Sequence, residues 1–295
     1  MATIDDVSIY QIAPHPSDPN LARNMQGVDE HGKTFSLKVI EERPLTIYLN
    51  SQEVVTSMTI GDYPQYLALG FLKNQGMLTK NDNVTGIDFD QELSVVVVRT
   101  ESESNLDKKM EKRTRTSGCA VGTIFGDMLD TIKGLELPHQ TVKTSWLYNL
   151  SKVINRTPSL YLSAGAIHGT VLCFKDSPLI YMEDVGRHNA VDKVSGWMSS
   201  EGIPAQDKIL YTTGRLTSEM VIKTAVMGIP VLVSRSGFTA WGVDLAREVG
   251  LTLIGRLRGR RFMCLSGSER LVTDLDPDLL PMEEKKYNRK GSNDK

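Results

Sequence analysis

Cysteine is scarce in this 295-residue chain, which has three residues of this type, odd in number and far apart: Cys119, Cys173 and Cys264. Such a set is not the disulfide framework of a small secreted protein, and we expect a reducing, cytoplasmic environment. Cys173 and Cys264 lie in apolar stretches and are expected in the core. No apolar run approaches the roughly 20 residues that span a bilayer, and the N-terminal segment lacks a signal-peptide core. A membrane protein and a secreted protein are therefore not expected.

Aromatic side chains make up only 6% of the sequence, and the formal net charge is −2. Neither value favours nucleic acid as a partner, because single-strand binders pair basic grooves with aromatic stacking residues. The close cysteine and histidine groupings of zinc sites are missing, as is the G-x-S-x-G turn of serine hydrolases. The sequence thus predicts no zinc or other resident metal, and Cys119 remains as the candidate nucleophile.

The order of strands and helices divides the chain into two expected domains. Residues 1–30 lack periodicity and predict a mobile arm. Residues 31–137 predict a small α/β domain with short strands and one helix near 61–76, capped at Asp62 and stopped near Gly76. No internal repeat is evident.

Strands and helices alternate strictly over 138–272, beginning with an amphipathic helix near 143–156. Two strands joined by a turn-rich tetrapeptide predict a hairpin within 166–184. Strands separated by helices of about 10–15 residues predict a largely parallel sheet covered by helices on both faces. A charged tail occupies 273–295. The predicted fold class is therefore α/β.

Polar side chains crowd three predicted strand-to-helix junctions, where sheets of this kind bind ligands. Backbone N–H groups and the helix dipole attract anions there, and arginine adds a planar fork for phosphate. The candidate binding residues at these junctions are Asp184, Arg187, His188, Arg215, Arg235 and Ser236. Polar residues also cap ordinary helices, but three arginine-bearing junctions favour an anion site. Asp184 with Lys193 or Arg187 fits a structural ion pair equally well.

A fourth basic cluster has four arginines in six residues: Arg256, Leu257, Arg258, Gly259, Arg260 and Arg261. One interpretation is a solvated edge hairpin whose charges oppose aggregation. The other is a binding site for a polyphosphate. A nucleotide-type ligand matches it better than a nucleic acid does, because Phe262 is the one aromatic residue that adjoins the cluster in sequence. His168, on an apolar strand, fits a structural role as well as a functional one.

Cys119 lies within RTRTSGCAVGT (113–123), among small and hydroxylated residues. Arg113 and Arg115 precede it, and a short helix is expected directly after it. Positive charge and a helix N-terminus both stabilise the nucleophilic thiolate. Flanking glycines give the loop freedom to move. Composition alone does not distinguish an inert thiol from a reactive one at this position.

Three stretches resemble the formate dehydrogenase accessory sulfurtransferases (FdhD): EDVGRHNAVDKVSGW (183–197), TGRLTSEMVIKTAVMGIPVLVSRS (213–236) and LTLIGRLRGRRF (251–262). The resemblance runs from about residue 35 to residue 271. It implies a small α/β N-terminal domain and a three-layer α/β/α C-terminal domain of cytidine-deaminase-like fold. Members of this family act as homodimers that accept persulfide sulfur from a cysteine desulfurase. They pass it to the molybdenum or tungsten bis(pterin guanine dinucleotide) cofactor before its insertion into the formate dehydrogenase catalytic subunit.

The resemblance carries over residue by residue. The family's S-C-G-x-C-G loop matches SGCAVGT, which keeps the first cysteine as Cys119 and has Gly122 in place of the second. The T-G-G-x-H motif becomes AGAIH and retains His168, and S-A-P-T becomes SGFT with Ser236. The segment that contacts the guanine dinucleotide in the family matches 256–261. The zinc ligands of true deaminases have no counterpart here, which implies an anion pocket rather than a deaminase.

A single retained cysteine still carries a persulfide, but its sulfur must then leave by attack of the acceptor or of an external thiol. The main hypothesis is a sulfur carrier with Cys119 as nucleophile and the arginine-bearing segments as the cofactor site. The alternative is a binding protein that delivers the finished cofactor, with Cys119 as a spectator. A third hypothesis, a nucleotide-processing enzyme on a deaminase-like scaffold, lacks the zinc ligands it needs.

Overall fold

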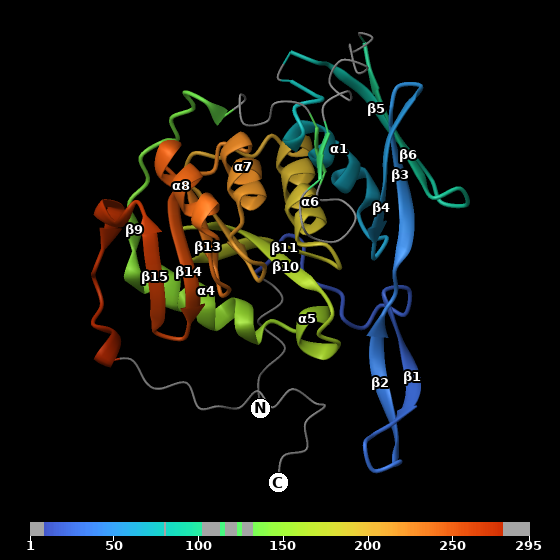
Figure 1. Ribbon diagram of the computed structural model, residues 1–295, viewed down its shortest axis with the longest axis horizontal. Coiled ribbons are helices and arrows are strands. Elements are labelled where there is room, and N and C mark those ends of the chain that lie inside the picture. Colours follow the sequence, from blue (N-terminus) through green and yellow to red (C-terminus); the bar gives the residue numbers. More distant parts are fainter. Residues whose placement is uncertain (1–8, 80, 102–112, 116–122, 126–131, 280–295) are drawn as a thin grey trace.

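A four-stranded sheet with one helix packed against it and a six-stranded sheet with several form the body of the molecule (Figure 1). The computed structural model describes residues 9–79, 81–101, 113–115, 123–125 and 132–279. None of the helices in these ranges is long and apolar enough to cross a membrane. The expectation of an α/β fold is confirmed.

The four-stranded sheet has the order β4 (Gln52–Thr59), β3 (Arg43–Leu49), β6 (Val95–Thr100) and β5 (Val84–Asp90). Alternate side chains of β3 are buried, namely Leu45, Ile47 and Leu49. They form one core with Phe71 of helix α1 (Pro64–Asn74). The period-two burial of the strand thus gives the helix its apolar platform.

Helix α1 starts at Pro64 and has no side-chain cap. The Asp62 carboxylate instead accepts a hydrogen bond from Lys193 of helix α6 (Arg187–Ser200), at 2.5 Å. The expectation that Asp62 caps the helix is therefore wrong, because a buried ammonium group from α6 takes this carboxylate. Proline at the first helical position needs no partner for a backbone N–H and fits this start.

The six-stranded sheet has the order β11 (Ser177–Asp184), β10 (His168–Phe174), β12 (Lys208–Thr212), β13 (Val231–Ser234), β14 (Thr252–Arg258) and β15 (Arg261–Ser266). The predicted hairpin is present as β10 and β11. Only β12, β13 and β14 pair in parallel, while β10 and β15 run antiparallel to their neighbours. The sheet is therefore mixed rather than largely parallel.

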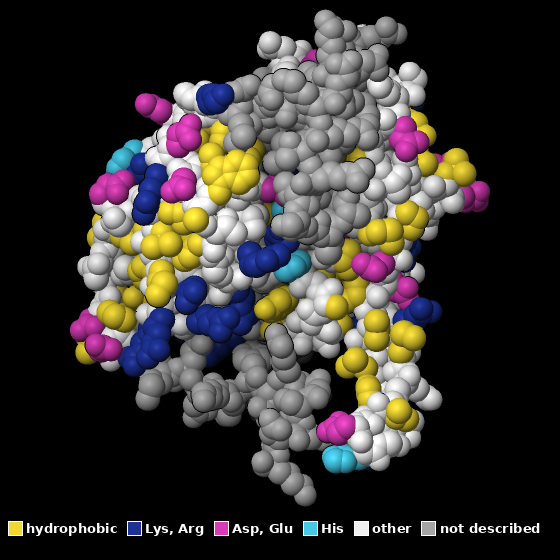
Figure 2. Space-filling view, viewed as in Figure 1, with side chains coloured by type: hydrophobic (Ala, Val, Ile, Leu, Met, Phe, Trp, Pro, Cys, Tyr) yellow, Lys and Arg dark blue, Asp and Glu magenta, His cyan; other side chains and the backbone are white. Residues whose placement is uncertain are grey.

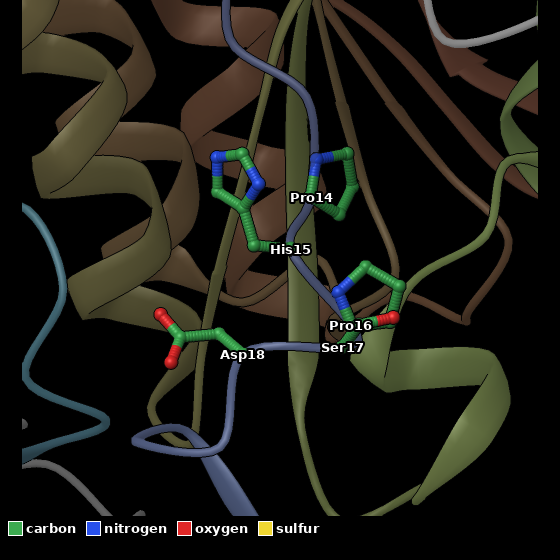
Figure 3. Close-up of a pocket in the computed structure, with 5 residues that line it drawn as sticks. All are labelled: Pro14, His15, Pro16, Ser17 and Asp18. Atoms are coloured by element: carbon green, nitrogen blue, oxygen red, sulfur yellow. The ribbon is translucent and has the colours of Figure 1, made fainter.

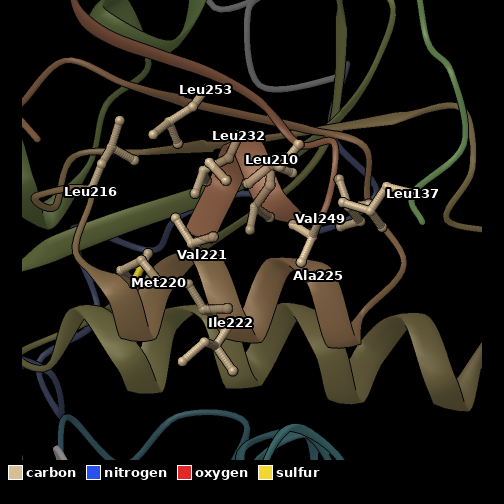
Figure 4. Close-up of a cluster of buried hydrophobic side chains, with 14 of the residues drawn as sticks. Leu137, Leu210, Leu216, Met220, Val221, Ile222, Ala225, Leu232, Val249 and Leu253 are labelled. Carbon is tan, nitrogen blue, oxygen red and sulfur yellow. The ribbon is translucent and has the colours of Figure 1, made fainter. Parts of the chain in front are cut away.

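Helices cover both faces of this sheet, which makes three layers. On one face, α6, α7 (Ser218–Val226) and α8 (Ala240–Glu248) pack against Leu172, Leu210, Leu232 and Leu253 (Figure 4). On the other face, α4 (Thr144–Arg156) packs against the alternate residues of the same strands, such as Val171 and Ile209. The short helix α5 (Leu160–Ser163) follows α4.

Part of the expected N-terminal arm makes defined contacts. Tyr10 is buried and its hydroxyl lies 2.8 Å from Thr157 Oγ1, while the Tyr181 amide donates to the carbonyl of Ile12 (2.8 Å). Farther on, β1 (Ala22–Val28) pairs with β2 (Thr34–Ile40) in a hairpin that projects from the body (Figure 1). The structure differs here from the arm expected over 1–30, because an exposed strand carries little apolar periodicity in its sequence.

Two further strand pairs complete the described secondary structure. β7 (Arg113–Arg115) pairs with β8 (Thr123–Phe125), so the residues directly after the Cys119 segment form a strand where a helix was expected. β9 (Val142–Lys143) pairs with β16 (Leu271–Val272), and two 3₁₀ turns, η2 (Ser268–Arg270) and η3 (Pro277–Leu279), flank β16. At the start of the charged tail, the Asp274 carboxylate accepts the Ser145 amide at 3.0 Å in the first turn of α4.

Candidate functional site

Four arginines lie at or near the carboxyl ends of four strands of the six-stranded sheet. β11, β12 and β13 are followed by Arg187, Arg215 and Arg235, and Arg256 lies two residues before the end of β14. These strands all run in one direction, because β10 is antiparallel to both β11 and β12. Their carboxyl ends therefore share one edge of the sheet, and we call these four residues the arginine row.

Hydrogen bonds join the loops that carry the arginine row. The Leu216 amide donates to the carbonyl of Gly237 (2.9 Å), and the Arg256 amide donates to the carbonyl of Ser236 (2.7 Å). The Ser236 amide also donates to the hydroxyl of Ser234 at the end of β13 (2.9 Å). Loops tied together in this way present side chains from a rigid base, as binding sites on sheet edges require.

Arg187, Arg215 and His168 meet at one end of the row. The aliphatic part of Arg187 lies against Gly214, where an added Cβ would be 3.0 Å from its Cβ and Cδ. Arg215 is exposed, and His168 opens β10 at the same edge. Burial, and then the charges of Arg187 and Arg215, lower the pKa of His168, so its imidazole is neutral at neutral pH. Its buried Nδ1 has no partner among the described residues and suits a hydrogen bond to a ligand.

The basic segment 256–261 covers the end of β14, the turn to β15 and the first residue of β15. Arg256 adopts a left-handed backbone (φ 55°), as does Gly259 (φ 56°). Arg258 and Arg261 are exposed at the two strand ends and face each other in the pairing. The turn therefore directs several guanidinium groups to solvent next to the arginine row.

Two residues of this segment have contacts of other kinds. The Leu257 side chain is fully buried in the core beneath α4, so the predicted ligand contact by this side chain is not available in this structure. Arg260 donates to the carbonyl of Pro277 (3.0 Å) and lies 3.6 Å from the Asp278 carboxylate. The segment therefore combines exposed arginines, at 258 and 261, with the side chain of Leu257, which anchors it in the core.

Asp184 is fully buried and belongs to a polar network between the two sheets. Its carboxylate lies 2.6 Å from Lys193 Nζ and accepts hydrogen bonds from the hydroxyl of Thr59 (2.5 Å) and the side-chain amide of Asn189 (3.0 Å). Of the two roles considered for Asp184, the structural ion pair with Lys193 is the one that these contacts support.

His188 lies beneath the surface at the start of α6. Its Nε2 is 3.1 Å from the Glu219 carboxylate at the start of α7, and both side chains are buried. Burial, followed by the positive charges of Lys223 and Arg187, lowers the pKa of His188 to about 2. This buried, neutral imidazole lies where the N-termini of the two helices meet, and its Nε2 makes no hydrogen bond among the described residues.

Glu219 and Lys223 were not expected at the site, whereas Asp192 was one of the polar residues at the first predicted strand-to-helix junction. Lys223 Nζ lies 2.6 Å from the Asp192 carboxylate, and Asp192 also accepts from the Asn74 side chain at 2.7 Å. Buried charges are costly unless they are paired. This pair, together with Asn74, connects α6, α7 and α1. The sequence contains little to indicate this ion pair, because Asp192 and Lys223 each look like one more polar residue of a helix.

The charge distribution on the surface agrees with this edge as a binding site. Figure 2 shows Lys and Arg side chains gathered on the lower part of the view, near the turn between β14 and β15 in the matching Figure 1. Two hollows lie elsewhere, one of about 400 Å³ lined by residues 14–18 (Figure 3) and one of about 870 Å³ lined by residues 88–92. Neither contains a predicted site residue or an arginine, so neither suits a polyanion.

Cys119 lies outside the described residues, and the paired positions on either side of it are Arg115 and Thr123. The other two cysteines lie in strands of the six-stranded sheet, where Cys173 is in the core as expected and Cys264 is packed against its rim. Cys173 is fully buried, and burial raises the pKa of its thiol far above the usual range. Cys264 is half-buried, and burial raises the pKa of its thiol too. Neither has the environment of a nucleophile. Among the described residues, no group of three or more His, Cys, Asp or Glu side chains is placed to hold a metal ion.

Comparisons with known proteins agree with this geometry. The sulfur carrier protein FdhD of Bacillus pumilus is 29% identical over 238 residues, which is 80% of this chain and 90% of that protein. The protein of the same name from Wolinella succinogenes is 30% identical over 236 residues, 79% of this chain and 82% of its own length. The crystal structure of a formate dehydrogenase accessory protein from Desulfotalea psychrophila superposes with a TM-score of 0.70 at 25% identity, and the match covers 85% of this chain and all of that one. Residues 40–272 match the model of the FdhD/NarQ family, and the chain therefore belongs to that family.

Proposed function

We propose that this protein is a sulfur carrier in the maturation of formate dehydrogenase. The observation that carries the proposal is the family match over residues 40–272, because the relatives described above are named sulfur carrier proteins. The solved structure with the same fold is named a formate dehydrogenase accessory protein. The substrate is then a molybdenum or tungsten bis(pterin guanine dinucleotide) cofactor, and the sulfur donor is a cysteine desulfurase. The protein acts as a homodimer in the cytoplasm and hands the cofactor to the dehydrogenase catalytic subunit.

Cys119 is the sulfur-bearing residue in this proposal. Its thiolate attacks the terminal sulfur of the donor's persulfide, that S–S bond breaks, and the donor leaves as a thiolate. Gly122 supplies no second thiol to resolve the Cys119 persulfide. An external thiol therefore attacks the inner sulfur, which releases hydrosulfide and leaves a mixed disulfide on Cys119 for reduction by a further thiol.

The arginine row, with the exposed arginines at 258 and 261, binds the phosphates and guanine of the substrate. Four guanidinium groups on one sheet edge match the charge of a ligand with two pyrophosphates, and arginine binds phosphate through paired hydrogen bonds. The neutral His168 imidazole offers its Nδ1 to the same ligand. Asp184 and His188 hold the site from beneath.

Mass spectrometry tests the sulfur-carrying step directly. Incubation with a cysteine desulfurase and cysteine should add about 32 Da, one sulfur atom, to the wild-type protein. Cys119→Ala should show no gain, while Cys173→Ala and Cys264→Ala should gain as the wild type does. A wild type without the added mass, or an equal gain in Cys119→Ala, would contradict the assignment.

The missing second cysteine favours one alternative, a protein that only delivers the finished cofactor. Complementation separates the two. A strain lacking this factor should recover formate dehydrogenase activity with the wild type and not with Cys119→Ala if sulfur transfer is the function. Full recovery with Cys119→Ala, together with loss of guanine nucleotide binding in Arg258→Ala, would establish delivery alone.

A further inference from the structure

Arg235 is held in place on two sides, unlike the exposed arginines of the row. Its Nη1 donates a hydrogen bond to Asn155 Oδ1 of α4 at 2.9 Å. Its guanidinium carbon lies 5.4 Å from the centroid of the Tyr161 ring on α5, within the range of a cation–π interaction. Arg215 and Arg256, in contrast, are exposed. Arg235 is therefore fixed before a ligand arrives.

Both groups that hold Arg235 are themselves anchored. The Asn155 side-chain amide donates to the hydroxyl of the buried Ser151, one turn earlier in α4 (3.1 Å). Tyr161 belongs to α5, and the buried Glu183 carboxylate accepts two backbone amides of this helix, that of Leu160 at 2.9 Å and that of Tyr161 at 2.8 Å. Glu183 ends the strand next to the site, so the support is continuous with the sheet.

We propose that Asn155 and Tyr161 are positioning residues that preorganise Arg235 for an anionic group of a guanine nucleotide. The Asn155 contact occupies one N–H group and the Tyr161 ring one side, which leaves the rest of the guanidinium fork for phosphate. A long side chain that is already fixed loses less rotamer freedom on binding, so affinity rises without a new contact to the ligand. This inference rests on the proposed function, because it assumes that the sheet edge binds the guanine nucleotide part of the substrate.

Titration of the full-length protein with guanosine diphosphate by calorimetry tests the inference. Asn155→Ala and Tyr161→Leu should each weaken binding about three- to tenfold, while Tyr161→Phe, which keeps the ring, should bind as the wild type does. Asn149→Ala is the matched control, because Asn149 lies on the same helix and bonds the carbonyl of Asp176 instead. Circular dichroism should confirm that each variant is folded.

A double-mutant cycle separates positioning from a general effect on the fold. Arg235→Ala should weaken guanosine diphosphate binding at least tenfold, and in that background Asn155→Ala and Tyr161→Leu should cause no further loss. A further loss of the same size in that background would overturn the inference. So would unchanged affinity in the single variants, in which case nucleotide binding by the wild type would leave the proposed function intact. A wild type that binds neither guanosine diphosphate nor inorganic pyrophosphate would overturn both.

Discussion

Gly70 of α1 lies directly against the backbone carbonyl of Asp192 in α6. An added Cβ at Gly70 would overlap that oxygen and would lie 2.6 Å from the Gly196 amide nitrogen. Gly196 in turn faces the backbone of Tyr66, where its own Cβ would overlap the carbonyl. The two helices cross at these glycines, and this close approach brings the four-stranded sheet up to the helices beside the site.

Gly70→Ala should therefore destabilise the protein, although alanine is the better helix former. The propensity gain is about 1 kcal/mol, whereas forcing a methyl group against a fixed backbone costs about 1–3 kcal/mol or more. Urea denaturation should show a lower free energy of unfolding. Gly86→Ala is the control, because the atom nearest to its added Cβ would be Arg99 Nε at an ordinary 3.7 Å. Equal stabilities of the two variants would contradict the role of the crossing.

The local elements were largely predictable from sequence, because their signals are local. The hairpin at 168–184 and the alternation of helices and strands after it follow from period-two and period-3.6 patterns and from turn residues. The direction in which β10 pairs with β12 depends on contacts between residues about 40 apart, which no such pattern records. That is why the α/β class was predictable and the mixed character of the sheet was not.

The candidate site, like the fold, was predictable from sequence in part. Arginine at strand ends was a usable signal, since sheet edges of this type bind anions. The residues that hold Arg235 could not be predicted, because Asn155 and Tyr161 look like ordinary surface residues until α4 and α5 are folded against the sheet. The residue types predicted an anionic ligand, which stays a prediction, and only the tertiary structure separates Arg235, whose guanidinium is held, from Leu257, which is buried.

Lys193→Met should be strongly destabilising. Lys193 Nζ is fully buried, lies 2.5 Å from the Asp62 carboxylate and 2.6 Å from that of Asp184, and donates to the carbonyl of Glu183 (2.9 Å). Removing the ammonium leaves buried carboxylates without compensation, which typically costs about 3–5 kcal/mol. Lys152→Met on the exposed side of α4 should change the free energy of unfolding by less than about 0.5 kcal/mol. Similar urea midpoints for both variants would show that the network adds little.

Glu183→Gln should change how stability depends on pH. Burial raises the pKa of Glu183 from 4.5 to about 7, even though the amides of Tyr161 and Leu160 lower it. Between these values the native protein binds a proton that the unfolded chain has released, so the carboxylate's contribution to stability falls as pH rises. Glutamine does not titrate. From pH 5.5 to pH 8, the free energy of unfolding of Glu183→Gln should therefore improve relative to wild type by about 1–2 kcal/mol.

Urea denaturation at both pH values measures this difference, with Glu92→Gln as the control. Glu92 is exposed in the turn after β5, so its substitution should leave the pH dependence as it is in the wild type. Comparing variant with wild type cancels the titration of other buried groups, including His188. A difference between Glu183→Gln and wild type that stays constant with pH would contradict the raised pKa.

Arg256→Gly should separate stability from binding. The left-handed backbone at Arg256 costs a residue with a side chain about 1–2 kcal/mol, whereas glycine adopts it freely but loses about 0.5–1 kcal/mol in entropy on folding. We therefore expect the variant to be as stable as the wild type or up to about 1.5 kcal/mol more stable. Arg258→Gly, two residues on and without a positive φ, has no strain to release and should be destabilised. Both should bind guanosine diphosphate more weakly, because each removes an exposed guanidinium beside the site. If urea denaturation found Arg256→Gly less stable than Arg258→Gly, the left-handed backbone at Arg256 would not be destabilising, and the prediction would be wrong.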